Sequence, residues 1–127
     1  AVGRFLRAGN AGIEHIICSP LLRAQQTAAV LLNEIGPTSV HTSEHLTSSS
    51  DPRTILREVS ELNKQAMLLI GHEPHLSTTI SVLLAGDERG RVTMRPCTLA
   101  CLSAQVPPEY DKACLQWLIH AEQMLSL

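Results

Sequence analysis

The chain has 127 residues, the size of one domain, since two domains in this length would each bury little core. Hydrophobic residues make up 44% and charged residues 17%, which supplies a packed interior and argues against disorder. Ten Lys and Arg against twelve Asp and Glu give a net charge of −2, without the basic surface that nucleic-acid binding requires. With only one Phe, one Tyr and one Trp, stacking platforms for bases are also excluded.

The sequence shows no membrane-spanning or secretory segment. Its longest apolar runs, at 28–32 and 66–70, are far shorter than the roughly 18 to 20 residues that cross a bilayer. The first ten residues lack the basic and apolar regions of a signal peptide, and residue 1 is Ala, which indicates a processed, engineered or truncated start. We expect no membrane association and a cytoplasmic location.

The four cysteines contain no Cys-x-x-Cys pair, and most lie in apolar runs. They are Cys18, Cys97, Cys101 and Cys114. This pattern predicts buried, reduced thiols rather than a zinc site or a disulfide framework, so we expect no bound metal.

Short apolar runs alternate with helical patterns, which is typical of an α/β fold. Residues 2–9 are expected to end a helix, and the isoleucine-rich run 13–18 has the length of a strand. Ser19 as N-cap and Pro20 as first helical residue then predict a helix that extends to Ile35.

The later elements alternate in the same way. Asp51 and Pro52 repeat the capping pattern and predict a helix to about Asn63. The other expected segments are a strand at 38–42, a polar loop at 43–51, a buried strand at 66–70, a helix at 76–84 and strands at 98–106 and 113–119. The last strand has a helix reaching Leu125 as its alternative. No repeat or linker interrupts the chain, so we expect one domain over 1–127.

The segment 19–27 (SPLLRAQQT) is the first candidate site. Arg23 falls in the first turn of the expected helix, where the helix dipole disfavours a cation. Its position therefore favours a compensating anion, and a planar guanidinium can bind two phosphoryl oxygens. The alternative is a solvated surface arginine.

The segment 71–75 (GHEPH) is the second candidate site. His72 follows the end of a strand, where it could donate to a phosphoryl oxygen or act as an acid or base. The alternative is a histidine that caps the helix. HEPH is not the zinc-binding H-E-x-x-H motif, and no nucleophile elbow, P-loop or dinucleotide fingerprint occurs.

Together, SPLLRAQQTA at 19–28 and LLIGHEPHLS at 68–77 resemble the histidine phosphatase superfamily, most closely the small bacterial SixA-type phosphohistidine phosphatases. The resemblance implies a three-layer α/β/α, phosphoglycerate mutase-like fold, with a mostly parallel sheet and helices on both faces. It implies a histidine nucleophile that takes the phosphoryl group, forms a phosphohistidine enzyme and is then hydrolysed, without a cofactor. In this family pattern, Arg23 is the second phosphate-binding arginine and His72 the second histidine, which hydrogen-bonds the transferring group.

The sequence departs from the family at the nucleophile. Family members open with a strand that ends in Arg-His-Gly, and no Arg-His-Gly occurs in these residues. The resemblance therefore implies that the N-terminal strand lies upstream of Ala1, that the domain is incomplete and that the chain as given is inactive. We interpret the remaining histidines as structural or exposed: His15, His41, His45, His75 and His120.

Glu44 lies near the position where some relatives have a carboxylic general acid, and whether it acts as one is left open. The imidazole leaving group of a phosphohistidine needs less protonation than an alkoxide. The small size and the resemblance imply a monomer that binds phosphate and acts on a phosphorylated protein, such as a histidine-containing phosphotransfer domain. The alternatives are a non-catalytic phosphate- or phosphohistidine-binding module and a small-molecule phosphomonoesterase of the same superfamily.

Overall fold

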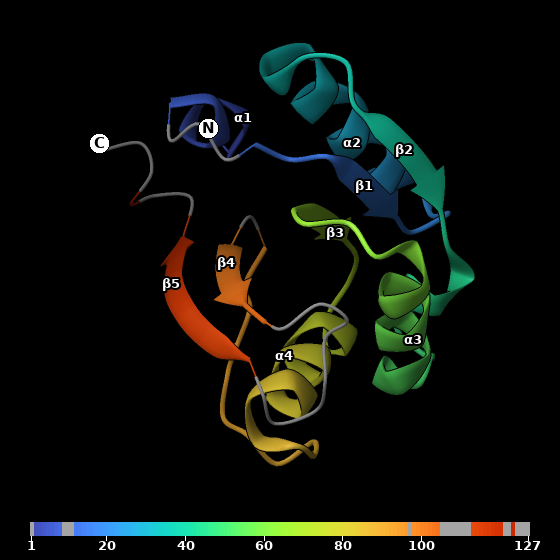
Figure 1. Ribbon diagram of the computed structural model, residues 1–127, viewed down its shortest axis with the longest axis vertical. Helices are drawn as coiled ribbons and strands as arrows, with labels where there is room; N and C mark the ends of the chain where they lie inside the picture. Colours follow the sequence, from blue (N-terminus) through green and yellow to red (C-terminus); the bar gives the residue numbers. More distant parts are fainter. Residues whose placement is uncertain (1, 9–11, 97, 105–112, 121–122, 124–127) are drawn as a thin grey trace.

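A computed structural model describes residues 2–8, 12–96, 98–104, 113–120 and 123 (Figure 1). In chain order the elements are α1 (Val2–Ala8), β1 (His15–Cys18), α2 (Leu22–Ile35), β2 (Ser39–Thr42), the 3₁₀ turn η1 (Glu44–Leu46), α3 (Pro52–Leu62), β3 (Met67–Ile70), α4 (His75–Ala85), β4 (Thr98–Ser103) and β5 (Cys114–His120). The predicted alternation of strands and helices is confirmed. Among these helices, none is long and apolar enough to cross a membrane.

Three strands form a parallel sheet in the order β2-β1-β3. The central strand, β1, is completely buried, which is why its sequence is a nearly continuous apolar run. Cys18 at its carboxyl end is paired with Thr42 of β2 and with Ile70 of β3. The carboxyl ends of all three strands therefore meet at one edge, where ligands bind in open α/β sheets.

Helices cover both faces of this sheet. Ile17 packs with Leu46 and Ile55 on the face covered by α3, whereas Cys18 packs against Ala24 and Ala28 of α2 on the other face. In Figure 1, α1 and α2 occupy the upper part of the molecule and α3 and α4 the lower part, with β1 and β3 between them. The expected α/β fold with a parallel sheet between helices is confirmed.

β4 and β5 form a separate antiparallel sheet. Leu99 of β4 and Ile119 of β5 nevertheless pack in one core cluster with Leu68 and Ile70 of β3. Within the described residues, no strand bonds to the second edge of β3 or of β4. The strand expected at 113–119, rather than a helix, is confirmed, whereas the last residues of the strand expected at 98–106 lie outside the described residues.

The two predicted helix starts differ in outcome. Asp51 caps α3 as expected, because its carboxylate accepts a hydrogen bond from the backbone N–H of Arg53 at 2.9 Å. The start of α2 was predicted wrongly: the helix begins at Leu22 and has Leu21 as its N-cap, without a side-chain cap. The backbone of Leu21 is extended (φ −70°, ψ 148°), so the helix cannot begin at Pro20.

The thiols of the described cysteines, Cys18, Cys101 and Cys114, are free. Cys18 is buried, and burial raises its pKa. Cys101 is partly buried, whereas Cys114 is exposed, so the expectation of buried thiols is wrong for Cys114. The first residues of its strand, 114–117, are all exposed, which the apolar sequence around Cys114 did not indicate. Cys97 lies outside the described residues.

Candidate active site

Backbone hydrogen bonds bring the two candidate segments together at the carboxyl edge of the parallel sheet. The N–H of Ser19 donates to the carbonyl oxygen of Ile70 at 2.9 Å, one residue beyond the paired strands. The N–H of Ser43 likewise donates to the carbonyl oxygen of Cys18 at 2.9 Å. The segments that follow β1, β2 and β3 are thus fixed side by side by main-chain bonds.

Arg23 lies in the first turn of α2, five residues beyond the end of β1. Its side chain is exposed and forms no ion pair with any described residue. The free N–H groups and the dipole of this helix end both favour an anion. Among the described residues, Arg23 thus has no counter-charge, and it lies beside backbone donors that also favour negative charge.

His72 follows β3 and is partly buried. Its Nε2 lies 2.8 Å from Oγ of Ser19, so its imidazole is held against the segment that follows β1. The N-cap of α4 is Pro74, which follows a cis peptide bond, and the side chain that bonds a first-turn N–H of this helix is Glu73, whose Oε1 accepts from Ser77 at 3.2 Å. The alternative interpretation of His72 as a helix cap is therefore wrong.

A cavity of about 240 Å³ lies elsewhere, between α1 and the carboxyl end of α2. Its lining includes Leu6, Ile13 and Ile35, with Arg7 as its one charged side chain. Since none of the carboxyl-edge residues lines it, this cavity is not part of the candidate site.

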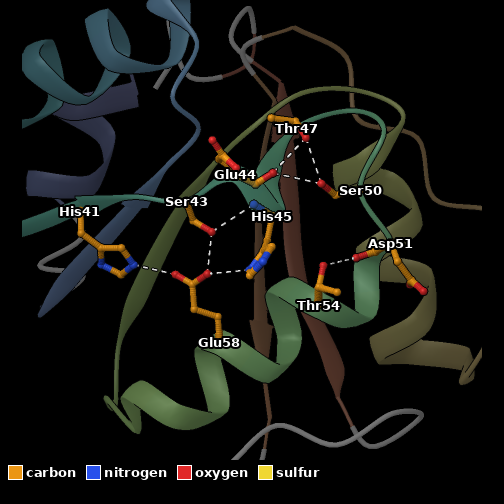
Figure 2. Close-up of polar contacts among 9 residues, drawn as sticks. All are labelled: His41, Ser43, Glu44, His45, Thr47, Ser50, Asp51, Thr54 and Glu58. Atoms are coloured by element: carbon orange, nitrogen blue, oxygen red, sulfur yellow. Dashed lines mark hydrogen bonds and ion pairs between the residues drawn. The ribbon is translucent and has the colours of Figure 1, made fainter.

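Glu44 begins η1, immediately after the segment that Ser43 anchors to β1. Its carbonyl oxygen accepts hydrogen bonds from Oγ1 of Thr47 at 2.9 Å and Oγ of Ser50 at 3.0 Å (Figure 2). Its carboxylate is exposed and forms no hydrogen bond or ion pair within the described residues. The backbone of Glu44 is therefore fixed near the carboxyl edge while its side chain is free to reach a ligand.

Sequence reasoning missed a polar cluster around Glu58 of α3, shown in Figure 2. Oε1 of Glu58 accepts from Ser43 at 2.5 Å and lies 3.0 Å from Nδ1 of His45, and Oε2 lies 2.6 Å from Nε2 of His41. The other ring nitrogen of His41, Nδ1, lies 2.6 Å from Nε2 of the buried His15. We call these five residues the Glu58 cluster; it links β1, β2, η1 and α3.

The surrounding groups lower the pKa values of two members of the Glu58 cluster, Glu58 and His15. Burial acts to raise the pKa of Glu58, but the hydrogen bonds from Ser43, His41 and His45 outweigh it, so the pKa lies below its ordinary value. Burial lowers the pKa of His15, and nearby His41 and Lys64 lower it further, against the opposing effect of Glu58.

The Glu58 cluster leaves no signal in the sequence, because its members are far apart along the chain. Only the strand register, which pairs Ile17 with His41, places the side chains of His15 and His41 on the same face. Among the described residues, no three His, Cys, Asp or Glu side chains are placed to hold a metal ion.

Two further histidines lie outside this cluster. His75 opens α4 and is buried, and neither of its ring nitrogens has a partner within the described residues. Burial lowers the pKa of His75, and the nearby His72 lowers it further, against Asp51. His120 ends β5, and its Nδ1 lies 2.7 Å from Oγ1 of Thr98.

Comparisons with known proteins agree with this architecture. The structure of the protein histidine phosphatase SixA complexed with tungstate has a TM-score of 0.78 at 20% identity, over 96% of this chain and 78% of that chain. A putative phosphohistidine phosphatase SixA from Nakamurella multipartitia has a TM-score of 0.75 at 22% identity, over 94% of this chain and 77% of that chain. The fold is therefore that of the phosphoglycerate mutase-like α/β proteins.

The match to a sequence family covers a smaller part of the chain than the structural matches do. The family model of the histidine phosphatase superfamily (branch 1) matches residues 1–49, which include Arg23 but not His72. No protein of curated function matches the chain. The resemblance to the histidine phosphatase superfamily, and to its SixA-type members in fold, is thus confirmed.

Proposed function

We propose that residues 1–127 are a single histidine phosphatase domain, incomplete at its N-terminus, that belongs to a phosphohistidine phosphatase. In this proposal the complete domain removes phosphate from protein histidine through a phosphohistidine enzyme intermediate. The observation that carries the proposal is the joining of the SPLLR and GHEPH segments by Ser19, which bonds both Ile70 and His72. Two motifs separated in sequence are thereby assembled at the ligand-binding edge of the sheet.

Arg23 and His72 are proposed to bind the transferring phosphoryl group. The guanidinium supplies a fixed pair of N–H donors that matches two phosphoryl oxygens, and His72 supplies a further donor from the opposite segment. During phosphoryl transfer, negative charge spreads over the three equatorial oxygens. Donors placed in advance at those oxygens stabilise that charge more than they stabilise the bound substrate.

The proposed reaction has two steps. In the first, the P–N bond of the substrate phosphohistidine breaks, a P–N bond to an enzyme histidine forms, and the substrate imidazole leaves. In the second, water breaks the enzyme P–N bond and releases phosphate. We propose that the enzyme histidine belongs to an Arg-His-Gly segment upstream of Ala1, and that the chain as given binds phosphate without turning over substrate.

Two of the open strand edges, those of β3 and β4, support this proposal. Within the described residues, β3 and β4 each have one edge without a neighbouring strand, and their side chains Leu68 and Leu99 share one core. An unpaired edge leaves a row of backbone donors and acceptors that a further strand satisfies. We propose that the missing N-terminal strand pairs there.

The substrate is proposed to be a protein, such as a histidine-containing phosphotransfer domain. Leu21 and Leu22, just before Arg23, are 51% and 72% exposed. An apolar pair beside the proposed phosphate site suits contact with a protein surface better than contact with a small polar metabolite. The likeness to a protein histidine phosphatase supports the same substrate class, and the tungstate bound to that protein, tetrahedral like phosphate, supports a phosphate site. We further propose a cytoplasmic monomer.

Two other functions have specific support. A non-catalytic phosphate- or phosphohistidine-binding module would use the same exposed Arg23 and partly buried His72 without a nucleophile. The exposed carboxylate of Glu44 near the carboxyl edge favours a small-molecule phosphomonoesterase, in which it would protonate an alkoxide leaving group.

The test compares the chain alone with a version extended at its N-terminus by a strand that ends in Arg-His-Gly. Both are assayed against a phosphohistidine protein and a sugar phosphate, and phosphate binding is measured by calorimetry. Our proposal expects phosphate binding by both and hydrolysis of phosphohistidine by the extended version alone. Binding without turnover in the natural protein, whose N-terminus mass spectrometry determines, would instead establish the binding module. Faster hydrolysis of the sugar phosphate would establish the phosphomonoesterase.

A further inference from the structure

The hydroxyl of Ser19 is enclosed and has two partners. Ser19 has no exposed surface, so its hydroxyl cannot bond bulk water. Its Oγ lies 3.3 Å from the backbone nitrogen of Leu21 and 2.8 Å from Nε2 of His72. Across the described part of the chain, no other donor or acceptor reaches this oxygen.

The directions of these two bonds follow from what each group can do. The N–H of Leu21 is a donor only, so Oγ of Ser19 accepts that bond. The hydroxyl proton of Ser19 then needs an acceptor, because a buried donor without a partner destabilises the folded chain. Among the described residues, the one acceptor within reach is Nε2 of His72, which accepts only when it carries no proton.

We infer that Ser19 is a positioning residue that holds His72 as the neutral tautomer protonated at Nδ1. A neutral imidazole with a bare Nε2 carries its single proton on Nδ1. No described residue bonds Nδ1 of His72, so this N–H is the donor available to an incoming oxygen. That the incoming oxygen is a phosphoryl oxygen rests on the proposed function.

A backbone hydrogen bond fixes the position of Ser19 and therefore of its hydroxyl. Its N–H is bonded to the carbonyl oxygen of Ile70, two residues before His72. The main chain and the side chain of Ser19 thus both bind the segment that carries His72. Rotation of the imidazole would break the bond to Oγ, so ring orientation and tautomer are set together.

The first test reads the protonation of His72 in the unmodified 127-residue chain. Long-range ¹H–¹⁵N NMR spectra distinguish a protonated from a bare ring nitrogen, and His72 is assigned through its own side-chain connectivities. We expect a protonated Nδ1 and a bare Nε2 at neutral pH in the absence of phosphate. A proton on Nε2, or an equal mixture of tautomers, overturns the inference without any variant being needed.

The second test removes the hydroxyl. In Ser19→Ala we expect His72 to lose its single tautomer and inorganic phosphate to bind about three- to tenfold more weakly, the effect of one misdirected hydrogen bond. Ser19→Thr keeps the hydroxyl and should retain the tautomer. The matched control is Ser81→Ala, because Ser81 is also buried and its hydroxyl bonds Asp87 and Gly90 instead. An unchanged tautomer in Ser19→Ala overturns the inference.

The same spectra separate this inference from the proposed function. If phosphate shifts the signals of Arg23 and His72 but Nε2 of His72 is protonated, the proposed site stands and the role of Ser19 is wrong. If the tautomer is as inferred but phosphate shifts neither residue, Ser19 still sets the tautomer and the proposed phosphate site is wrong.

Discussion

Ser19 and Ile70 are joined through their main chains, the N–H of Ser19 donating to the carbonyl oxygen of Ile70 at 2.9 Å. This bond continues the β1–β3 ladder, which ends with the pair Cys18 and Ile70, by one residue into the loops. The segments that lead to Arg23 and His72 therefore begin from fixed points on adjacent strands. Functional groups held by a rigid sheet edge lose little entropy when a ligand binds, and each can be tested by a single substitution.

Arg23→Ala should remove the bidentate contact to phosphate. In the chain extended with Arg-His-Gly, we expect kcat/KM for a phosphohistidine protein to fall about 10²- to 10³-fold, the usual effect of losing one charge-stabilising donor. We expect kcat/KM of Arg23→Lys to lie between those of the unsubstituted chain and of Arg23→Ala, because lysine keeps the charge but lacks the planar guanidinium. Arg57→Ala is the control, since Arg57 is also exposed but lies on α3. Full activity of Arg23→Ala would show that the phosphate site is assigned wrongly.

Glu44→Gln should separate the two classes of substrate. An alkoxide leaving group needs a proton, so loss of a general acid is expected to slow phosphomonoester hydrolysis about 10²- to 10⁴-fold. Phosphohistidine hydrolysis by the same extended variant should change little, because imidazole leaves more easily. The measurement is kcat on both substrates. Equal slowing on both would mean that Glu44 serves phosphohistidine chemistry as well, and no slowing on either would remove it from the site.

Most of the fold could be predicted from local sequence signals. The buried run in β1 and the Asp51-Pro52 pair each carry their structural meaning within a few residues. Ser19 shows the limit of such signals. Ser-Pro is a strong helix start, yet the helix begins at Leu22 because the backbone of Leu21 is extended. The hydroxyl of Ser19 bonds a histidine that is remote in sequence, which no local signal indicates.

Only the part of the candidate site that lies in short local motifs could be predicted from the sequence. Arg23 and His72 stand in short motifs next to strand ends, so their approximate places followed once the strands were known. The Glu58 cluster could not be found, because it depends on parallel pairing of β1 with β2 and on how α3 crosses that face. No spacing between His15, His41 and Glu58 in the sequence indicates this strand pairing or this helix position.

Ile55 tests the packing of α3 on the sheet. Its side chain is fully buried and packs with Ile17 and Leu46. Ile55→Ala should lower the free energy of unfolding by about 2 to 5 kcal/mol and Ile55→Val by about 0.5 to 1.5 kcal/mol, as measured by urea denaturation. Val30→Ala provides the control, because Val30 is 62% exposed and should change stability by less than about 0.5 kcal/mol. Similar losses in Ile55→Ala and Val30→Ala would contradict this packing.

The Glu58 cluster should make stability depend on pH. Oε2 of Glu58 accepts from Nε2–H of His41, so Nδ1 of His41 and Nε2 of His15 share one proton between them. Protonation of both rings would bring two N–H groups face to face and break their hydrogen bond. The lowered pKa of His15 agrees with this geometry, as burial and His41 both disfavour its charged form.

The sign of the effect follows from linkage. Because the pKa of His15 is lower in the folded chain than its ordinary value of 6.5, the unfolded chain binds more protons near pH 6.5. The contribution of His15 to the free energy of unfolding is therefore fully present above pH 6.5 and declines as the pH falls below it. His75, whose pKa is also lowered, contributes a decline in the same direction. The lowered pKa of Glu58 adds a second decline at more acidic pH, as its carboxylate takes up a proton.

Urea denaturation between pH 8 and pH 5 measures this decline. His15→Gln keeps an N–H that can donate to Nδ1 of His41 but has no titrating ring, so we expect a shallower loss of stability toward pH 5. His75 remains in this variant, so part of the decline should persist. Val40→Thr, an exposed change on the same sheet, should keep the original slope. If His15→Gln kept the full slope, proton uptake at His15 would not be its source, and His75 would be the next residue to replace.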